Sequence, residues 1–270
     1  MTPFRANRVA AIVLRQLYLM RGSFTRILPL FIWVGIDMVL WGFMTRYLNS
    51  VAQPGLDFVP TLLGAVLMWD FFQRVMHGTT TAFFEDVWSR NFLNVFATPL
   101  GVSEYVAGLV LTSIVTSLLG LIVMVVLASG CFGLSFLSYG LLVIPFALVL
   151  FLFGIALGVF GCAVVLRLGP ASEWFIWPIP AIVSPFAGVF YPVATLFAWM
   201  QGLAHALPPS YVFEALRTIV RGGAPPLAPL LWSTALALAY VVAACLFFSQ
   251  VHRRAVRTGL LARYSAESVN

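Results

Sequence analysis

Long apolar runs alternate with short polar segments along almost the whole of this 270-residue chain. A helix that crosses a bilayer needs about 20 mainly apolar residues. Six stretches meet that requirement, at residues 27–47, 58–77, 105–128, 141–166, 174–190 and 227–249. The pattern therefore predicts an all-α membrane protein with six transmembrane helices, and residues 1–270 form a single transmembrane domain.

The composition supports a membrane location. Hydrophobic residues make up 61% of the chain and charged residues only 9%, which would leave a water-soluble domain with a very large exposed apolar surface. The net charge is +6, and all fifteen basic residues are arginine. In a membrane protein such a surplus records orientation and contact with anionic lipid headgroups, so membrane lipids are expected partners and nucleic acid is not.

The arginines also predict the orientation. If the N-terminus is cytoplasmic, twelve of the fifteen lie on or near the inner side, and only Arg46, Arg217 and Arg221 lie outside. The positive-inside rule then places both termini in the cytoplasm, with residues 250–270 as a tail. Basic residues before the first apolar run resemble a signal peptide, but that run is too long and contains Asp37, so we expect a retained span.

An amphipathic helix is predicted within residues 1–26, before the first span. On a helix of 3.6 residues per turn, one arc carries polar side chains and another carries apolar ones. The polar arc holds Arg5, Arg8, Arg15 and Gln16, and the apolar arc holds Val9, Val13, Leu17 and Met20. We expect this helix to lie in the cytoplasmic headgroup layer; an ordinary basic flank is the alternative.

Residues 79–104 form the most informative polar segment and are expected on the cytoplasmic side. The segment combines a polar surface with apolar contacts, and Pro99 and Gly101 end the run. The polar residues are Glu85, Asp86, Ser89 and Arg90, and the apolar ones are Phe84, Val87, Trp88 and Phe92. A short amphipathic helix here suits the docking of a partner, although a plain surface helix would show the same pattern.

Prolines interrupt the last third of the chain. Pro178, Pro180 and Pro185 lie in the fifth span, and each removes a backbone donor and clashes with the preceding turn, so this span should be kinked or broken. Residues 191–224 stay apolar but contain further prolines. We expect an outer re-entrant segment there, whose helices enter the outer leaflet and return.

Four ionisable residues fall within or at the edge of the predicted spans: Asp37, Asp70, Arg74 and His77. Asp70 and Arg74 are four residues apart on one helix, and His77 continues the same face. A substrate path and simple internal neutralisation explain them equally well. A metal site is not expected, because one aspartate and one histidine seven residues apart offer too few ligands.

No catalytic residues can be assembled, and the absence of lysine excludes a P-loop for ATP. We therefore do not expect the chain by itself to be an enzyme.

Four motifs, in order along the chain, carry a family resemblance. The first is the basic N-terminal helix. The others are Ala-Thr-Pro-Leu-Gly-Val-Ser-Glu-Tyr at 97–105 with Gly108 after it, Gly-Val-Phe-Tyr-Pro-Val-Ala-Thr-Leu at 188–196, and Leu-Pro-Pro-Ser-Tyr-Val-Phe-Glu-Ala-Leu-Arg at 207–217. Together they resemble the membrane subunit of ABC type-2 transporters, also called type V ABC exporters. Phe197, where the family often has proline, and Leu109, where it usually has a basic residue, are departures.

The resemblance also implies partner subunits, cofactors on those partners, and roles for particular residues. Two copies, or one copy and a similar permease, would pair in a bacterial cytoplasmic (inner) membrane, and two separate ABC ATPase subunits would dock beneath them. The chain itself would hold no cofactor, since ATP and Mg would bind to the ATPases. The residues implied in ATPase coupling are Glu85, Asp86, Trp88 and Arg90, on a coupling helix. Those implied in an outer gate are Phe190, Tyr191, Pro192, Tyr211, Glu214 and Arg217.

The substrate is expected to be amphipathic or lipid-linked, such as a glycan, a glycolipid or a hydrophobic small molecule, and to be exported. Aromatic residues make up 15% of the chain and would suit a wall that contacts lipid tails or sugars, although aromatics also pack in lipid without such a role. A proton-coupled secondary transporter that uses Asp37, Asp70 and His77 is an alternative, without visible inverted repeats to support it.

Overall fold

The computed structural model describes residues 5–51, 59–89, 91–134, 141, 143–224 and 227–259. Within these ranges every regular element is a helix. The elements are α1 (Ala6–Arg21), α2 (Phe24–Val51), η1 (Val59–Leu63), α3 (Gly64–Trp88), α4 (Phe92–Ala97), α5 (Val102–Phe132), α6 (Val143–Leu168), η3 (Pro170–Phe175), α7 (Ile179–Ala187), η4 (Val193–Thr195), α8 (Ala198–His205), α9 (Pro208–Val220) and α10 (Leu227–Arg257).

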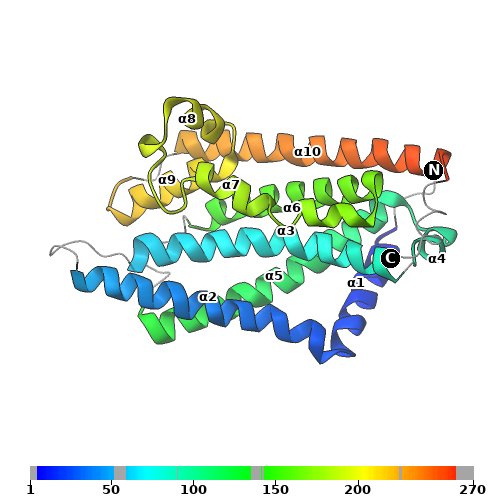
Figure 1. Cartoon of the computed structure of the whole chain (residues 1–270), viewed down its shortest axis with the longest axis horizontal. Helices are drawn as coiled ribbons and strands as arrows, with labels where there is room; N and C mark the ends of the chain where they lie inside the picture. The colour runs from blue at the N-terminus through cyan, green and yellow to red at the C-terminus, as the bar shows by residue number, and fades with distance from the viewer. Residues whose placement is uncertain are drawn as a thin grey trace.

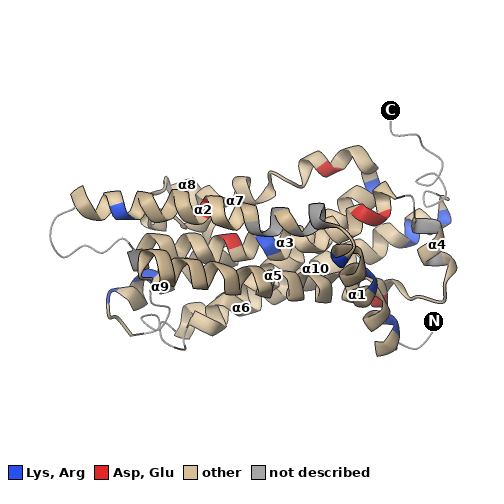
Figure 2. Ribbon diagram, turned by 90° about the horizontal axis from the view of Figure 1, so that it is seen from below, with Lys and Arg blue, Asp and Glu red and all other residues tan. Residues whose placement is uncertain are grey.

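The long helices run along one axis of the molecule, and the short ones gather at its ends. α1 and α4 lie at the end where α10 finishes, whereas α8 and α9 lie at the opposite end (Figure 1). Basic positions occur at both ends, with more of them at the end that carries α1 (Figure 2). This distribution is the one expected of a membrane protein with its α1 end in the cytoplasm.

The central helix α3 packs tightly between α5 and α6 because glycines face the contact. A Cβ added to Gly78 would lie 2.7 Å from the Ser113 Oγ of α5. A Cβ on Gly158 of α6 would lie 2.9 Å from the Thr79 Cβ of α3. Small residues that let two helices approach this closely are typical of helix packing in membranes.

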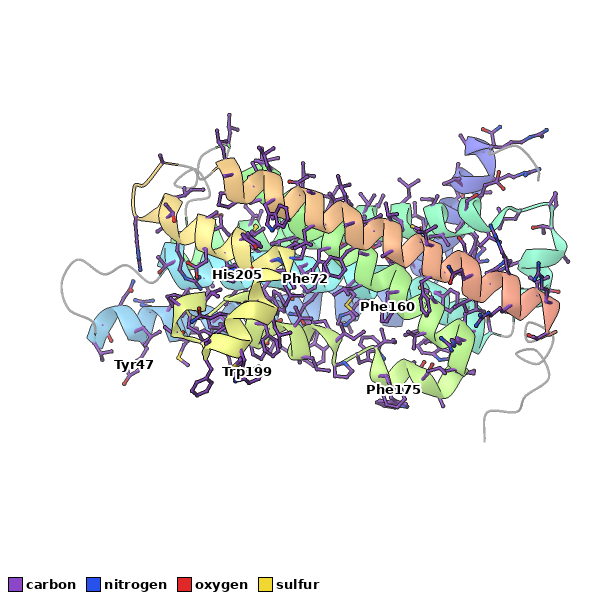
Figure 3. All side chains as sticks on the ribbon, turned by 90° about the horizontal axis from the view of Figure 1, so that it is seen from above. Tyr47, Phe72, Phe160, Phe175, Trp199 and His205 are labelled. Atoms are coloured by element: carbon purple, nitrogen blue, oxygen red, sulfur yellow. The ribbon has the colours of Figure 1, made fainter. Side chains whose placement is uncertain are left out.

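Aromatic rings fill the interior of the bundle and also cover its outside. Phe72 of α3 is fully buried and stacks on Phe153 of α6, with ring centroids 5.6 Å apart. Phe175 and Trp199 are 70% and 66% exposed, and Figure 3 shows both at the periphery. An exterior with large apolar side chains of this kind suits contact with lipid.

Three of the described helices are long and apolar enough to cross a membrane, as judged by length and composition: α5, α6 and α10. They coincide, within a few residues, with the spans predicted at 105–128, 141–166 and 227–249, except that α10 continues to Arg257. The span predicted at 27–47 lies inside α2. α3 is less apolar than these helices because Asp70, Gln73, Arg74 and His77 follow one another along it.

The prediction of a separate short amphipathic helix around residues 85–94, within the segment 79–104, is wrong. α3 continues past His77 to Trp88, so Glu85, Asp86 and Trp88 belong to its last turn, and only the six-residue α4 follows. The reason is that Phe83, Phe84 and Val87 are buried in the same core as the rest of α3. That burial stabilises the continued helix.

The break that the prolines predict in the fifth span, residues 174–190, is confirmed. The region contains the 3-10 turn η3 and then α7, which begins only at Ile179. α7 has nine residues, so at 1.5 Å per residue it covers about 14 Å, roughly half of the apolar thickness of a bilayer. The prolines exclude a regular helix across this region.

The inward face of the N-terminal helix α1 lies between the two predicted arcs, since it takes Val9 from the apolar arc and Gln16 from the polar arc. Val9, Ile12 and Gln16 are its buried residues. A Cβ on Gly108 of α5 would lie 2.6 Å from the Ile12 side chain, and the Gln16 Nε2 donates to the Ala82 carbonyl of α3 at 3.3 Å. The helix is therefore docked on α3 and α5 through part of its polar arc.

Candidate functional site: a cleft along α3

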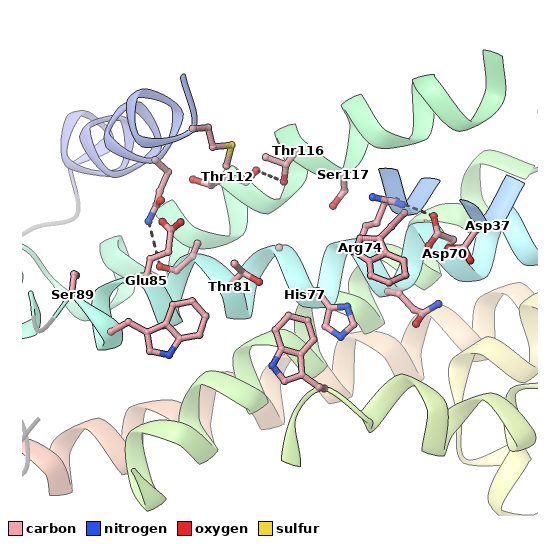
Figure 4. A pocket seen from close by; sticks show the side chains of 18 residues that line it. Asp37, Asp70, Arg74, His77, Thr81, Glu85, Ser89, Thr112, Thr116 and Ser117 are labelled. Atoms are coloured by element: carbon pink, nitrogen blue, oxygen red, sulfur yellow. Dashed lines mark hydrogen bonds and ion pairs between the residues drawn. The ribbon is translucent and has the colours of Figure 1, made fainter. Parts of the chain in front are cut away.

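A cleft of about 930 Å³ runs along α3 and collects polar and aromatic side chains from α1, α2, α5 and the segment before α7. Figure 4 shows Asp37, Asp70 and Arg74 at one end of it, Glu85 and Ser89 at the other, and His77 between them. The lining residues are Gln16, Met20, Trp33, Asp37, Asp70, Gln73, Arg74, His77, Gly78, Thr81, Ala82, Glu85, Trp88, Ser89, Thr112, Thr116, Ser117 and Trp177. The cleft therefore joins the predicted intramembrane charges to two of the predicted coupling residues.

The charged end of the cleft combines two carboxylates and one guanidinium. Asp70 Oδ2 accepts a hydrogen bond from Arg74 Nε at 2.8 Å, which confirms the contact predicted from their spacing. Asp37 reaches the same end from α2. The arrangement leaves one carboxylate more than the arginine can neutralise.

Two buried polar atoms in the middle of the cleft lack a hydrogen-bond partner in the part of the chain that the structure describes. They are the Nε2 of His77 and the Oγ of Ser117. The imidazole of His77 lies beside the Trp177 indole, with ring centroids 4.8 Å apart. Because buried polar groups are normally paired, these two atoms are available to a bound molecule or to water.

At the other end of the cleft, Trp88 closes the last turn of α3. Its Nε1 donates to the Glu173 Oε2 of η3 at 2.9 Å, and its side chain is 51% exposed. Ser89, the next residue, is also exposed. This turn is the part of the predicted coupling surface that a partner could reach. Arg90, predicted with it, lies outside the described residues.

Asp86 faces inward, unlike its exposed neighbour Trp88. It is only 2% exposed, pairs with Arg15 of α1, and accepts a hydrogen bond from the Tyr105 hydroxyl of α5 at 2.7 Å. The carboxylate of Asp86 therefore links three helices of its own chain, and its implied role in ATPase coupling stays a prediction. The sequence pattern could not show this, since Arg15 and Tyr105 are distant along the chain.

Glu104 is a functional candidate that the sequence analysis did not single out. It is 1% exposed and accepts hydrogen bonds from the backbone amides of Gly101, at 2.6 Å, and Arg5, at 2.7 Å. The Arg8 guanidinium lies 3.3 Å away. Its place three residues after Gly101, in the first turn of α5, is a typical capping position and could have revealed the role.

The residues predicted at the outer gate lie at the opposite end of the molecule, and most of them form one cluster. Arg217 of α9 donates to the carbonyl oxygens of Gly188, Val189 and Tyr191, and Glu214 accepts from the Val193 amide at 2.7 Å. These bonds fix α9 to the turn after α7.

The aromatic members of the predicted gate have separate contacts. Phe190 stacks on Trp41 of α2 at 5.1 Å, and the Tyr191 hydroxyl donates to the Pro185 carbonyl at 2.9 Å. Tyr211 instead donates to the His205 carbonyl at 2.9 Å. Pro192 precedes the 3-10 turn η4.

The described residues form a helical membrane-type fold with a polar cleft along α3. A family model described as ABC-2 type transporter matches residues 9–220, and this chain belongs to that family. The family resemblance expected from the four motifs is thereby confirmed, and with it the role as a membrane subunit of an ABC transporter. A comparison with curated proteins finds no match.

Proposed function

We propose that this chain is the permease half of an ATP-driven exporter and that an amphipathic molecule passes through the cleft along α3. The observation that carries the proposal is the continuity of this cleft. It extends from Asp37 and Asp70 to Trp88 and Ser89 at the end of α3, so that a force applied to the end of α3 acts on a wall of the substrate site.

The ATPase contact is proposed at the exposed turn that ends α3. Trp88 and Ser89 are exposed there, and Asn94 is exposed on the neighbouring α4. α1, α4 and the end of α10 lie at this same end of the molecule (Figure 1). Asp86, immediately before Trp88, ties this turn to Arg15 and Tyr105. Closure of a docked ATPase would therefore move α1, α3 and α5 together. This rigid-body motion would carry the ATP-driven movement to the cleft.

The proposal includes two permease copies and two ATPase subunits that bind ATP and Mg, in a bacterial cytoplasmic membrane. It keeps six crossings, with α2, α3 and the broken η3–α7 segment added to the three apolar helices. The larger number of basic positions at the α1 end supports cytoplasmic termini (Figure 2). At the opposite end, the Arg217 cluster would form the exit.

Copurification with an ABC ATPase tests this proposal. The tagged chain should retain a P-loop ATPase whose ATP hydrolysis depends on the permease. Trp88→Ala should lower the retained ATPase several-fold. Trp199→Ala is the matched control, because Trp199 is 66% exposed and lies on α8, at the other end. Absence of any ATPase from the purified complex, or equal loss in the two variants, would contradict the assignment.

A proton-coupled secondary transporter is the second candidate, because Asp37, Asp70 and His77 line one cleft. Such a protein would need no ATPase and would move its substrate with a proton gradient. The copurification test above separates the two candidates, because a secondary transporter would retain no ABC ATPase.

A further inference from the structure

The charge of the cleft indicates what kind of molecule it accepts. Its charged lining residues are Asp37, Asp70, Glu85 and Arg74, so acids outnumber the single arginine. Arg74 is held by Asp70 at 2.8 Å. Asp37 makes no hydrogen bond or ion pair with the residues that the structure describes. Arg74 also attracts Asp37, but one arginine cannot neutralise two carboxylates. A carboxylate away from bulk water is costly without a full counter-charge, so this end of the cleft is suited to a cation.

Tryptophan side chains line the cleft near these carboxylates. Trp33 of α2 and Trp177, just before α7, are 61% and 42% exposed, and both line the cleft. The indole face is the strongest cation–π partner among the aromatic side chains, and it also buries a large apolar area. The walls therefore offer both an apolar contact surface and a second attraction for positive charge.

Ser117 of α5 provides an independent sign that a ligand enters the cleft. Its side chain is 2% exposed, and its Oγ is buried without a hydrogen-bond partner among the described residues. The residue lines the cleft, close to Arg74 in Figure 4. A hydroxyl in this position can accept a hydrogen bond from a bound ammonium group or from a water molecule that accompanies it.

We propose that the cleft selects a cationic amphipathic molecule, with its positive group beside Asp37 and its apolar body against Trp33 and Trp177. This inference rests on the transport function proposed above and narrows its substrate class to organic cations. Arg74 then has a positioning role, since it holds Asp70 by an ion pair and leaves Asp37 as the carboxylate that faces the substrate.

Two probes of the same shape and opposite charge test whether the cleft prefers cations. Tetraphenylphosphonium is a cation and tetraphenylborate is its anionic counterpart, and both have apolar aromatic bodies. Binding is measured by equilibrium dialysis on the purified permease–ATPase complex in an uncharged detergent, with protein-free micelles as the blank. We expect tetraphenylphosphonium to bind at least tenfold more tightly than tetraphenylborate.

Substitutions in the cleft then test which residues cause the preference for the cation. Asp37→Asn should weaken binding of the cation about tenfold, which corresponds to about 1.4 kcal/mol, and should leave binding of the anion unchanged or stronger. Asp37→Glu should retain most of the cation preference. Trp33→Leu should weaken binding of the cation, whereas Trp199→Leu, outside the cleft, should not. Each variant must retain the ATPase to the same extent as the unchanged chain, which shows that it is folded.

The outcomes separate this inference from the function on which it rests. Equal affinity for both probes, or an Asp37→Asn variant with unchanged preference, overturns the cation selection while the copurified ATPase still supports the transport role. If no ATPase copurifies, the transport proposal fails, and the same dialysis on the permease alone still decides whether the cleft prefers the cation.

Discussion

Asp86→Ala should destabilise the protein strongly, although Asp86 lies in a segment whose sequence resembles an exposed surface helix. The carboxylate is 2% exposed and is shared between Arg15 and the Tyr105 hydroxyl, which is 2.7 Å away. Removal of the carboxylate leaves the fully buried Tyr105 hydroxyl without its acceptor and leaves Arg15 without its counter-ion.

The magnitude follows from the burial of the partners. Removal of one partner from a buried ion pair costs about 3 to 5 kcal/mol. The Arg15 side chain is 28% exposed and can regain water, which places the expected loss at the low end, about 3 kcal/mol. Tyr105→Phe alone should cost about 1 to 2 kcal/mol. The double variant should cost clearly less than the sum, because the two side chains share one hydrogen bond.

The assay is unfolding of the purified permease in mixed micelles by titration with denaturing detergent. Glu85→Ala is the matched control, because Glu85 precedes Asp86 in the same turn and is only half-buried; it should change the stability by less than about 1 kcal/mol. If Asp86→Ala and Glu85→Ala have equal effects, or if the Asp86 and Tyr105 changes add without coupling, the inward placement of Asp86 is refuted.

Three further predictions concern the ends of the molecule. Gly108→Ala should cost about 1 to 3 kcal/mol because its methyl group meets Ile12, and Ile12→Ala in the same chain should recover part of that loss in the unfolding assay. Glu104→Ala should free α1 and speed its tryptic cleavage, whereas Ser103→Ala, on the exposed side of the same turn, should not; equal cleavage would contradict the capping role. Arg217→Ala should reduce ATP-driven transport while ATPase binding persists. Arg217→Lys should restore little, because its single nitrogen cannot hold the Glu214 carboxylate and the three carbonyls at the same time, as the two terminal nitrogens of arginine do. Arg221→Ala, on an exposed side chain, is its control, and transport lost equally in both variants would show that the contacts with residues 188–191 are unimportant.

The features that depend on local pattern could be predicted from the sequence. The continuous apolar runs of α5, α6 and α10 have no competing signal, so length and hydropathy place them within a few residues. The prolines before and within α7 predict its break, because their effect on the backbone does not depend on the surroundings. The Asp70–Arg74 contact follows from helical spacing alone.

The features that depend on tertiary contacts could not be predicted from the sequence. α3 continues through Glu85 because Phe83, Phe84 and Val87 meet a core formed by other helices, and hydropathy does not show which face of an amphipathic segment another helix will cover. Asp86 is paired with a residue 71 positions away. Asp37 and Trp177 come from separate parts of the chain, and only the packing of α2 and the segment before α7 around α3 brings them to one cleft.

The most direct test of the central claim is substrate flux in reconstituted vesicles. Vesicles that contain the permease and its copurified ATPase are given labelled tetraphenylphosphonium and ATP with Mg on the ATPase side. They should take up the cation faster than protein-free vesicles only while ATP is hydrolysed. Vesicles with the permease alone should match protein-free vesicles under a proton gradient. Full flux from the permease alone, driven by that gradient, would contradict the account.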